Sequence, residues 1–210
     1  INPGVDPVEK LDKNSLDKVE SLLKIKTPRL ITVSRFDKRK NHEKVIMALR
    51  NLKQIYPDIV YICVGYGDEE DNIKKLVKEL DLEGQVMFFK DISNELKNVL
   101  IAKSNIFVMP SVIHKKSVEG FGIAYVEAAQ YGIPSIGGKD GGAADAIDHK
   151  KTGLICDGNS LDDVYSSINF MLQNKKYLEY GKSAKENISK FYWPNTVSYT
   201  HLTLPTKVRV

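Results

Sequence analysis

Cysteine is scarce in this sequence, and the two that occur, Cys63 and Cys156, lie far apart in the chain. Each belongs to an apolar run and neither to a Cys-x-x-Cys pair, so a disulfide framework is not indicated. The pattern favours a reducing compartment in which both thiols are small core residues. We therefore expect a cytoplasmic protein.

Long apolar runs and metal-ligand patterns are also lacking. Nearly apolar stretches such as Ile59 to Tyr66 have less than half of the roughly 18 consecutive apolar residues that a membrane-spanning helix needs. The four histidines show no metal-ligand spacing. Carboxylates do cluster at Asp68 to Asp71, but acidic side chains in the first turn of a helix are stabilising without a metal. The sequence predicts neither a membrane helix nor a bound metal.

Charge of one sign does not dominate any region. The chain has 31 Lys and Arg against 27 Asp and Glu, a net charge of +4, and the two signs are interleaved along its length. This argues against a surface dedicated to nucleic acid. With 210 residues, 42% of them hydrophobic, the chain suits one compact domain.

Short apolar runs alternate with amphipathic segments of helical period, which predicts a parallel sheet with crossover helices. The fold class that we expect is α/β, a Rossmann-like three-layer arrangement with helices on both faces of the sheet. The expected strands are Leu30 to Val33, Ile59 to Val64, Val86 to Phe89, Ile106 to Met109, Ser135 to Ile136 and Gly153 to Cys156. Helices are expected over Leu161 to Leu172 and Tyr177 to Phe191, besides those between the strands.

The turn after the first expected strand is unusually basic. Four cations occur in the six residues from Arg35 to Lys40, just before a helix for which Asn41 is the expected N-cap. The helix dipole disfavours cations at this end, whereas a bound diphosphate would offset the repulsion. The alternative is a solvated basic loop.

A second turn, after the strand that ends at Met109, combines glycines with two glutamates. Gly120 and Gly122 would let backbone N–H groups approach a phosphate, while Glu119 lies in the loop and Glu127 lies one and a half turns into the next helix. The alternative is an ordinary helix entry with Glu127 facing water.

A third turn, from Gly137 to Asp145, has four glycines in six positions. Glycines at this density indicate either backbone with positive φ or close approach of a ligand. Ligand binding and a plain turn both remain open.

Together these turns resemble the carboxyl-terminal domain of the family 4 retaining glycosyltransferases of GT-B architecture. The resemblance extends from Asn2-Pro3-Gly4-Val5-Asp6 to about Asn195. Its strongest element is the pair Glu119 and Glu127, which are separated by seven residues. Glu119 begins the motif Glu-Gly-Phe-Gly, and Glu127 begins the motif Glu-Ala-Ala-x-x-Gly-Ile-Pro.

The resemblance implies the roles of the site residues. Arg35 and Lys40 would bind the donor diphosphate, and Glu119 would bind hydroxyls of the transferred sugar; these three are the implied catalytic residues. Glu127 would bind the ribose, and Met87 to Asp91 would line the base pocket. The donor-binding residues that the resemblance implies are Gly120, Phe121, Gly122, Ile123, Glu127, Phe89 and Lys90.

The implied activity is transfer of a hexose from a nucleoside-diphosphate sugar to an acceptor that the sequence does not identify. The cations that bind the diphosphate would take the place of a divalent ion, and no Asp-x-Asp triplet occurs in the sequence. Neither a metal ion nor another cofactor is therefore expected. Lys90 stands where many relatives carry glycine, and His114-Lys115-Lys116 is a basic insertion; these departures leave the base and the sugar open.

The resemblance also sets the expected domain boundaries. Residues 1–195 would form the nucleotide-sugar-binding domain, and residues 196–210 fit neither the family nor the preceding sequence and are expected to be an extraneous tail. An acceptor-binding domain would precede Ile1, and any peripheral membrane association would come from that domain. Two alternatives remain: an isomerase or phosphorylase with a GT-B fold, and a non-catalytic nucleotide-binding module.

Overall fold

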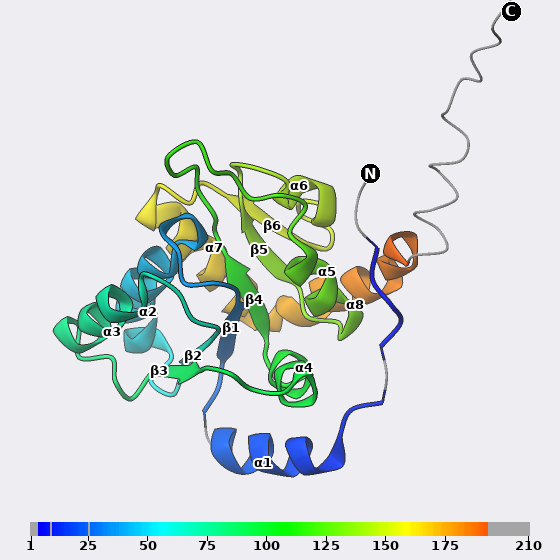
Figure 1. Ribbon diagram of the computed structural model, residues 1–210, viewed down its shortest axis with the longest axis horizontal. Helices are drawn as coiled ribbons and strands as arrows, with labels where there is room; N and C mark the ends of the chain where they lie inside the picture. The colour runs from blue at the N-terminus through cyan, green and yellow to red at the C-terminus, as the bar shows by residue number, and fades with distance from the viewer. Residues whose placement is uncertain (1–3, 9, 25, 193–210) are drawn as a thin grey trace, which may run out of the picture.

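A six-stranded parallel sheet forms the centre of the molecule (Figure 1). The computed structural model describes residues 4–8, 10–24 and 26–192; the tail expected at 196–210 lies outside them. The strand order is β3-β2-β1-β4-β5-β6, and every neighbouring pair is parallel. The strands are β1 (Arg29–Val33), β2 (Val60–Val64), β3 (Val86–Phe89), β4 (Ile106–Met109), β5 (Ser135–Gly138) and β6 (Gly153–Cys156).

Helices cover both faces of this sheet, which confirms the expected three-layer fold. One buried apolar cluster joins one face to α2, α3 and α7, and a second joins the other face to α1, α4 and α5. The inner strands β2 and β4 are buried at every position, as is typical of continuous apolar runs in a doubly covered sheet. The helices are α1 (Lys13–Leu23), α2 (His42–Ile55), α3 (Glu70–Glu79), α4 (Asn94–Ala102), α5 (Ile123–Gln130), α6 (Ala143–Ala146), α7 (Leu161–Leu172) and α8 (Tyr177–Glu186).

Two helical expectations need correction. The segment Tyr177 to Phe191 is not one helix, because α8 ends at Glu186 and a 3-10 turn, η3 (Ile188–Phe191), follows it. Helix α1 was not expected at all. Its signals are present in the sequence: the Asp12 side chain caps the helix by accepting a hydrogen bond from Ser15 N–H, at 2.7 Å.

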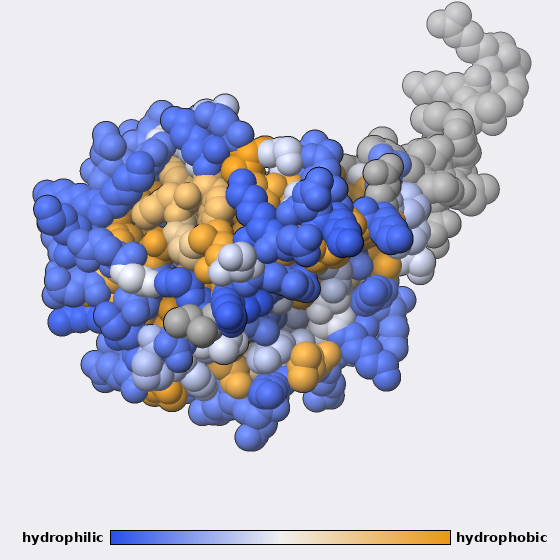
Figure 2. All heavy atoms as spheres, turned by 90° about the horizontal axis from the view of Figure 1, so that it is seen from below, coloured by the Kyte–Doolittle hydropathy of each residue, from blue (hydrophilic) through white to orange (hydrophobic). Residues whose placement is uncertain are grey.

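The edge strand β3 leaves apolar surface partly uncovered. Met87, Phe88 and Phe89 are each only partly buried. Figure 2 looks at the molecule from below the view of Figure 1 and shows apolar side chains gathered in a hollow among hydrophilic ones, on the side where β3 lies. Of the helices formed by the described residues, none has the length and apolar character needed to cross a membrane.

Candidate functional site

The polar residues of interest meet where the order of the sheet reverses. Strands β1 and β4 are hydrogen-bonded neighbours, but the chain leaves β1 towards β2 on one side and leaves β4 towards β5 on the other. The loops that follow the two strands therefore diverge at the carboxyl edge of the sheet, and the place between them, where open α/β sheets bind their ligands, is called the crevice below. The basic turn follows β1, and the glutamate-bearing turn follows β4.

Glu119 is the centre of contact between these two turns. Its carboxylate is only 8% exposed, and its Oε2 accepts hydrogen bonds from Lys40 Nζ at 2.5 Å and Arg39 Nη1 at 3.1 Å. Arg39 Nη1 also donates to the carbonyl oxygen of Val118 at 2.9 Å. Two cations on one oxygen compensate the cost of burying the negative charge. Neither cation is part of a solvated loop.

These cations lie on a short 3-10 turn, η1 (Lys38–Lys40), rather than on α2 itself. Asp37 caps the turn by accepting from Lys40 N–H, at 3.2 Å. Asn41, the expected N-cap of α2, occupies that position with φ 62°, but its side chain makes no capping bond. Its amide instead donates to the carbonyl oxygens of Pro110 and Gly158, at 2.9 and 2.8 Å. Asn41 therefore fixes the basic turn against the loops after β4 and β6.

The glycine-rich third turn supports the backbone around Glu119. Gly142 N–H donates to the Glu119 carbonyl oxygen at 3.1 Å, and Glu119 and Gly141 form an isolated β-bridge. A Cβ at Gly142 would lie 2.2 Å from the carbonyl oxygen of Gly120, closer than any real Cβ approaches. Gly142 is therefore needed for the close packing of one backbone segment on another.

The N-terminus of α5 presents backbone donors beside Glu119. The N-cap residue Gly122 has φ 73° and ψ 58°, in the left-handed region that favours glycine. The ring of Phe121 packs on Phe191 with 5.6 Å between centroids. Among the described residues, no group accepts a hydrogen bond from the N–H groups of Phe121, Gly122 or Ile123. Free N–H groups at a helix start form a natural site for an anion.

Glu127 lies one turn into α5 and does not face water freely. Its Oε1 accepts from Lys97 Nζ at 3.0 Å, and its side chain is 30% exposed. Lys97 belongs to α4, on the same face of the sheet. The structure thus places the two glutamates of the motif in two separate ion pairs.

Arg35 and the β3 segment complete the set of expected residues. Arg35 is exposed, and within the described chain nothing binds its guanidinium. Phe89 packs partly against the core, and its carbonyl oxygen accepts from Gly65 N–H at 2.9 Å. Lys90 is exposed and lies over the Tyr66 ring at 5.4 Å. Since β3 is two strands from β1 in the sheet, the carboxyl ends of these two strands are about 10 Å apart.

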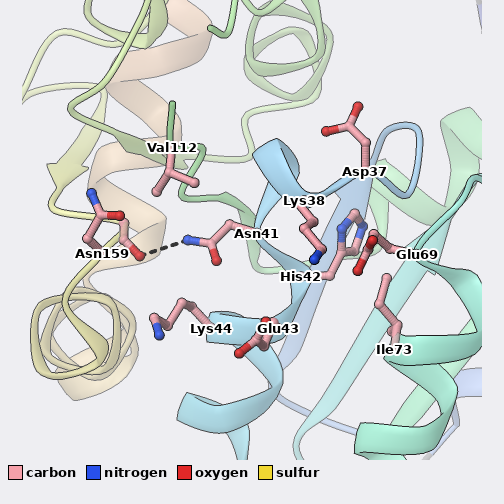
Figure 3. A pocket seen from close by; sticks show the side chains of 11 residues that line it. Asp37, Lys38, Asn41, His42, Glu43, Lys44, Glu69, Ile73, Val112 and Asn159 are labelled. Atoms are coloured by element: carbon pink, nitrogen blue, oxygen red, sulfur yellow. Dashed lines mark hydrogen bonds between the residues drawn. The ribbon is translucent and has the colours of Figure 1, made fainter. Parts of the chain in front are cut away.

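Behind the basic turn lies a hollow of about 250 Å³ that the sequence had not indicated (Figure 3). It is lined by residues from η1, the starts of α2 and α3, and the loops after β4 and β6. His42 borders it, only 2% exposed, and neither ring nitrogen has a hydrogen-bond partner among the residues that the structure describes. Burial lowers the pKa of His42 to about 4; the charge of Asp37 opposes this shift and that of Lys40 adds to it. The imidazole is neutral at physiological pH.

Two contact residues, Arg39 and Lys97, were missed by reasoning from the sequence. Arg39 was one of four cations in its turn, with nothing to distinguish it from its neighbours, and Lys97 lay outside every motif.

Within the described part of the chain, His, Cys, Asp and Glu side chains form no group of three or more that could hold a metal ion.

Comparison with known proteins identifies the family. The family model for glycosyl transferases group 1 matches residues 14–190. A GDP-mannose-dependent alpha-(1-6)-phosphatidylinositol monomannoside mannosyltransferase of Mycolicibacterium smegmatis is 29% identical over 151 residues, which are 71% of this chain and 40% of that protein. Sucrose-phosphate synthase 4 of Arabidopsis thaliana is 28% identical over 184 residues, 80% of this chain and 17% of the synthase.

Solved structures share the fold. The Anabaena protein Alr3699/HepE in complex with UDP superposes with a TM-score of 0.76 at 22% identity, covering 92% of this chain and 54% of that one. The carboxyl-terminal domain of LpcC, a glycosyl transferase group 1 family protein from Francisella tularensis, superposes with a TM-score of 0.71 at 22% identity, covering 89% of this chain and 97% of that domain. The chain spans about 40% of the mannosyltransferase it matches. Because the family model covers most of the sequence, the chain belongs to the glycosyl transferases group 1.

Proposed function

We propose that this chain is the donor-binding domain of a retaining glycosyltransferase that moves a hexose from a nucleoside-diphosphate sugar to an acceptor. The observation that carries the proposal is the position of the Lys40–Glu119 pair, 2.5 Å apart, in the crevice between β1 and β4 and beside the free N–H groups that begin α5. The same place thus offers a cation and N–H groups that can bind a phosphate, and a carboxylate that can accept hydrogen bonds from sugar hydroxyls.

The diphosphate would be held by Arg35, Lys40 and the N–H groups at Phe121 to Ile123. Arg35 has no partner within the described chain, and Lys40 exchanges Glu119 for a phosphate oxygen. The released Glu119 carboxylate then accepts from the sugar hydroxyls. As the bond between sugar C1 and the diphosphate breaks, these cations and N–H groups stabilise the negative charge that develops on the leaving group. This arrangement requires no metal ion.

Two further contacts complete the donor. Glu127 accepts from the ribose hydroxyls, and the segment Met87 to Asp91 contacts the base. The spacing of about 10 Å between the ends of β3 and β1 suits a nucleoside that extends from the sheet edge to the crevice. The relatives support a nucleotide-sugar donor by their names: one is GDP-mannose-dependent, and another was crystallised with UDP.

Isothermal titration of the chain with UDP, GDP and ADP, with and without a chelator, tests this proposal. We expect one nucleoside diphosphate to bind, with an affinity that the chelator leaves unchanged. The double variant Arg35→Ala/Lys40→Ala should lose at least about 100-fold in affinity, because two charge-assisted contacts are removed.

Arg50→Ala/Lys78→Ala is the matched control, since it removes two exposed cations from α2 and α3 outside the crevice. Its affinity should equal that of the unchanged chain. Equal losses in both double variants would show a general charge effect and contradict the proposed diphosphate contacts. Absence of binding by all three nucleotides in the folded chain would contradict its role in donor binding.

A further inference from the structure

The ion pair between Lys97 and Glu127 joins two helices that flank the proposed donor site. Lys97 Nζ lies 3.0 Å from Glu127 Oε1, and the two side chains are 21% and 30% exposed. Both helices pack on the same face of the sheet. The pair is therefore shielded enough to hold a defined geometry, yet open enough for a ligand to reach the carboxylate.

The position of the pair along its two helices matches that of a ribose. Helix α4 begins three residues after Asp91, the end of the segment proposed for the base, and Lys97 lies near the end of its first turn. Helix α5 begins at Ile123, the last of the N–H groups proposed for the diphosphate, and Glu127 lies four residues further. Each side chain is thus about one turn from its segment, and the ribose joins the base to the diphosphate.

The hydrogen bonds of Glu127 leave room for a diol. Lys97 binds Oε1, and no described residue binds Oε2. A carboxylate can accept about four hydrogen bonds through its two oxygens, so two neighbouring hydroxyls can bind while the lysine stays in place. By holding one oxygen, the ammonium keeps the Glu127 side chain in a single rotamer before the ligand binds. The entropy cost of ordering this side chain is therefore not added to the free energy of ligand binding.

We propose that Lys97 is a positioning residue that holds Glu127 in the geometry that binds both ribose hydroxyls of the donor. It thereby determines the preference of the site for ribonucleotides. The inference rests on the proposed function, because it takes the Glu127 contact with ribose as given. Lys97 acts through Glu127 and touches neither the base nor the diphosphate.

The test compares the preferred nucleoside diphosphate with its 2′,3′-dideoxy analogue by titration of the 210-residue chain. Lys97→Met keeps the aliphatic stem and removes the charge. It should weaken binding of the ribonucleotide about three- to tenfold and leave binding of the dideoxy analogue unchanged. Lys97→Arg, which can still donate to Oε1, should retain most of the affinity. Glu127→Ala should lower the ribonucleotide affinity to that of the analogue, and adding Lys97→Met should have no further effect.

Each other result overturns the inference in a recognisable way. Equal weakening of both ligands by Lys97→Met would show that Lys97 contacts the base or the diphosphate itself. No weakening of either would show that the ion pair has a structural role alone. If Glu127→Ala still preferred the ribonucleotide to its analogue as strongly as the unchanged chain does, the ribose contact in the proposed function would be wrong, and the role of Lys97 with it. If no nucleotide bound, donor binding itself would be wrong.

Discussion

The two glutamates of the Glu-x7-Glu motif are alike in sequence but have different surroundings. Glu119 is 8% exposed and receives two cations on one oxygen, and its backbone is fixed by the glycine-rich turn. Glu127 is 30% exposed, receives one lysine and belongs to a regular helix. The Glu119 region is held from three loops at once, whereas the Glu127 region depends on one contact between helices. The same residue type is therefore held by several independent contacts in one position and by a single contact in the other.

The largest difference that we predict between the two regions is their sensitivity to acid. His42 adjoins the basic turn beside Glu119, whereas the segments that form α4 and α5 contain no histidine. Its pKa is about 6.5 in the unfolded chain and about 4 in the folded one. Between these values the unfolded state binds more protons, so the stability that neutral His42 contributes is present above pH 6.5 and is lost as the pH falls towards 4. The loss is about 3 kcal/mol.

Urea unfolding at pH 7 and pH 4 measures this effect. The variant His42→Phe fills a similar volume, contacts the same aromatic neighbours and cannot titrate. Its free energy of unfolding should fall by about 3 kcal/mol less between the two pH values than that of the unchanged chain. His114→Phe is the control, because no described residue bonds with the His114 ring, and it should behave like the unchanged chain. Equal acid sensitivity in all three proteins would contradict the contribution of His42.

Removing one cation from each region tests the comparison directly. Arg39→Met should lower the free energy of unfolding by about 2 kcal/mol, since it removes bonds to the Val118 carbonyl and to a buried carboxylate. Lys97→Met removes one bond to a half-exposed carboxylate and should cost less than about 1 kcal/mol. Denaturant unfolding at pH 7 gives both values. Similar costs for the two substitutions would mean that the Glu119 region is no more tightly held than the Glu127 region.

The sequence predicted the sheet well because most of its strand positions are buried on both sides, with edge strand β3 the exception. Runs such as Ile106 to Met109 are apolar at every position, which leaves little ambiguity in a parallel α/β fold. The basic turn and the two glutamates were also visible, since they follow strands at the edge where ligands bind. Each of these predictions depends only on residues that are close together in the sequence.

The partners of the glutamates could not be predicted, because they come from distant parts of the chain. Arg39 and Lys40 are 80 and 79 residues from Glu119, and Lys97 is 30 residues from Glu127. Which cation reaches which carboxylate depends on the crossing of loops after β1 and β4 and on the packing of α4 beside α5. The glycine-rich turn was ambiguous for the same reason. Its function in packing becomes visible only when the backbone of Gly120 is placed against it.

The smallest effect that we predict separates packing from ligand approach among the glycines. A Cβ at Gly142 would collide with backbone, but a Cβ at Gly120 would meet no atom of the described residues within 4 Å. Gly120→Ala should therefore leave the free energy of unfolding unchanged within about 0.5 kcal/mol, as for other surface substitutions. If Gly120 is open so that phosphate oxygens can approach the backbone, the methyl group should weaken nucleoside-diphosphate binding about tenfold, a cost of about 1.4 kcal/mol. Gly84→Ala, in an equally open turn far from the crevice, should change neither quantity. An unchanged affinity in Gly120→Ala would show that the open space beside Glu119 is not used by the ligand, and Gly120 would then not be one of the donor-binding residues.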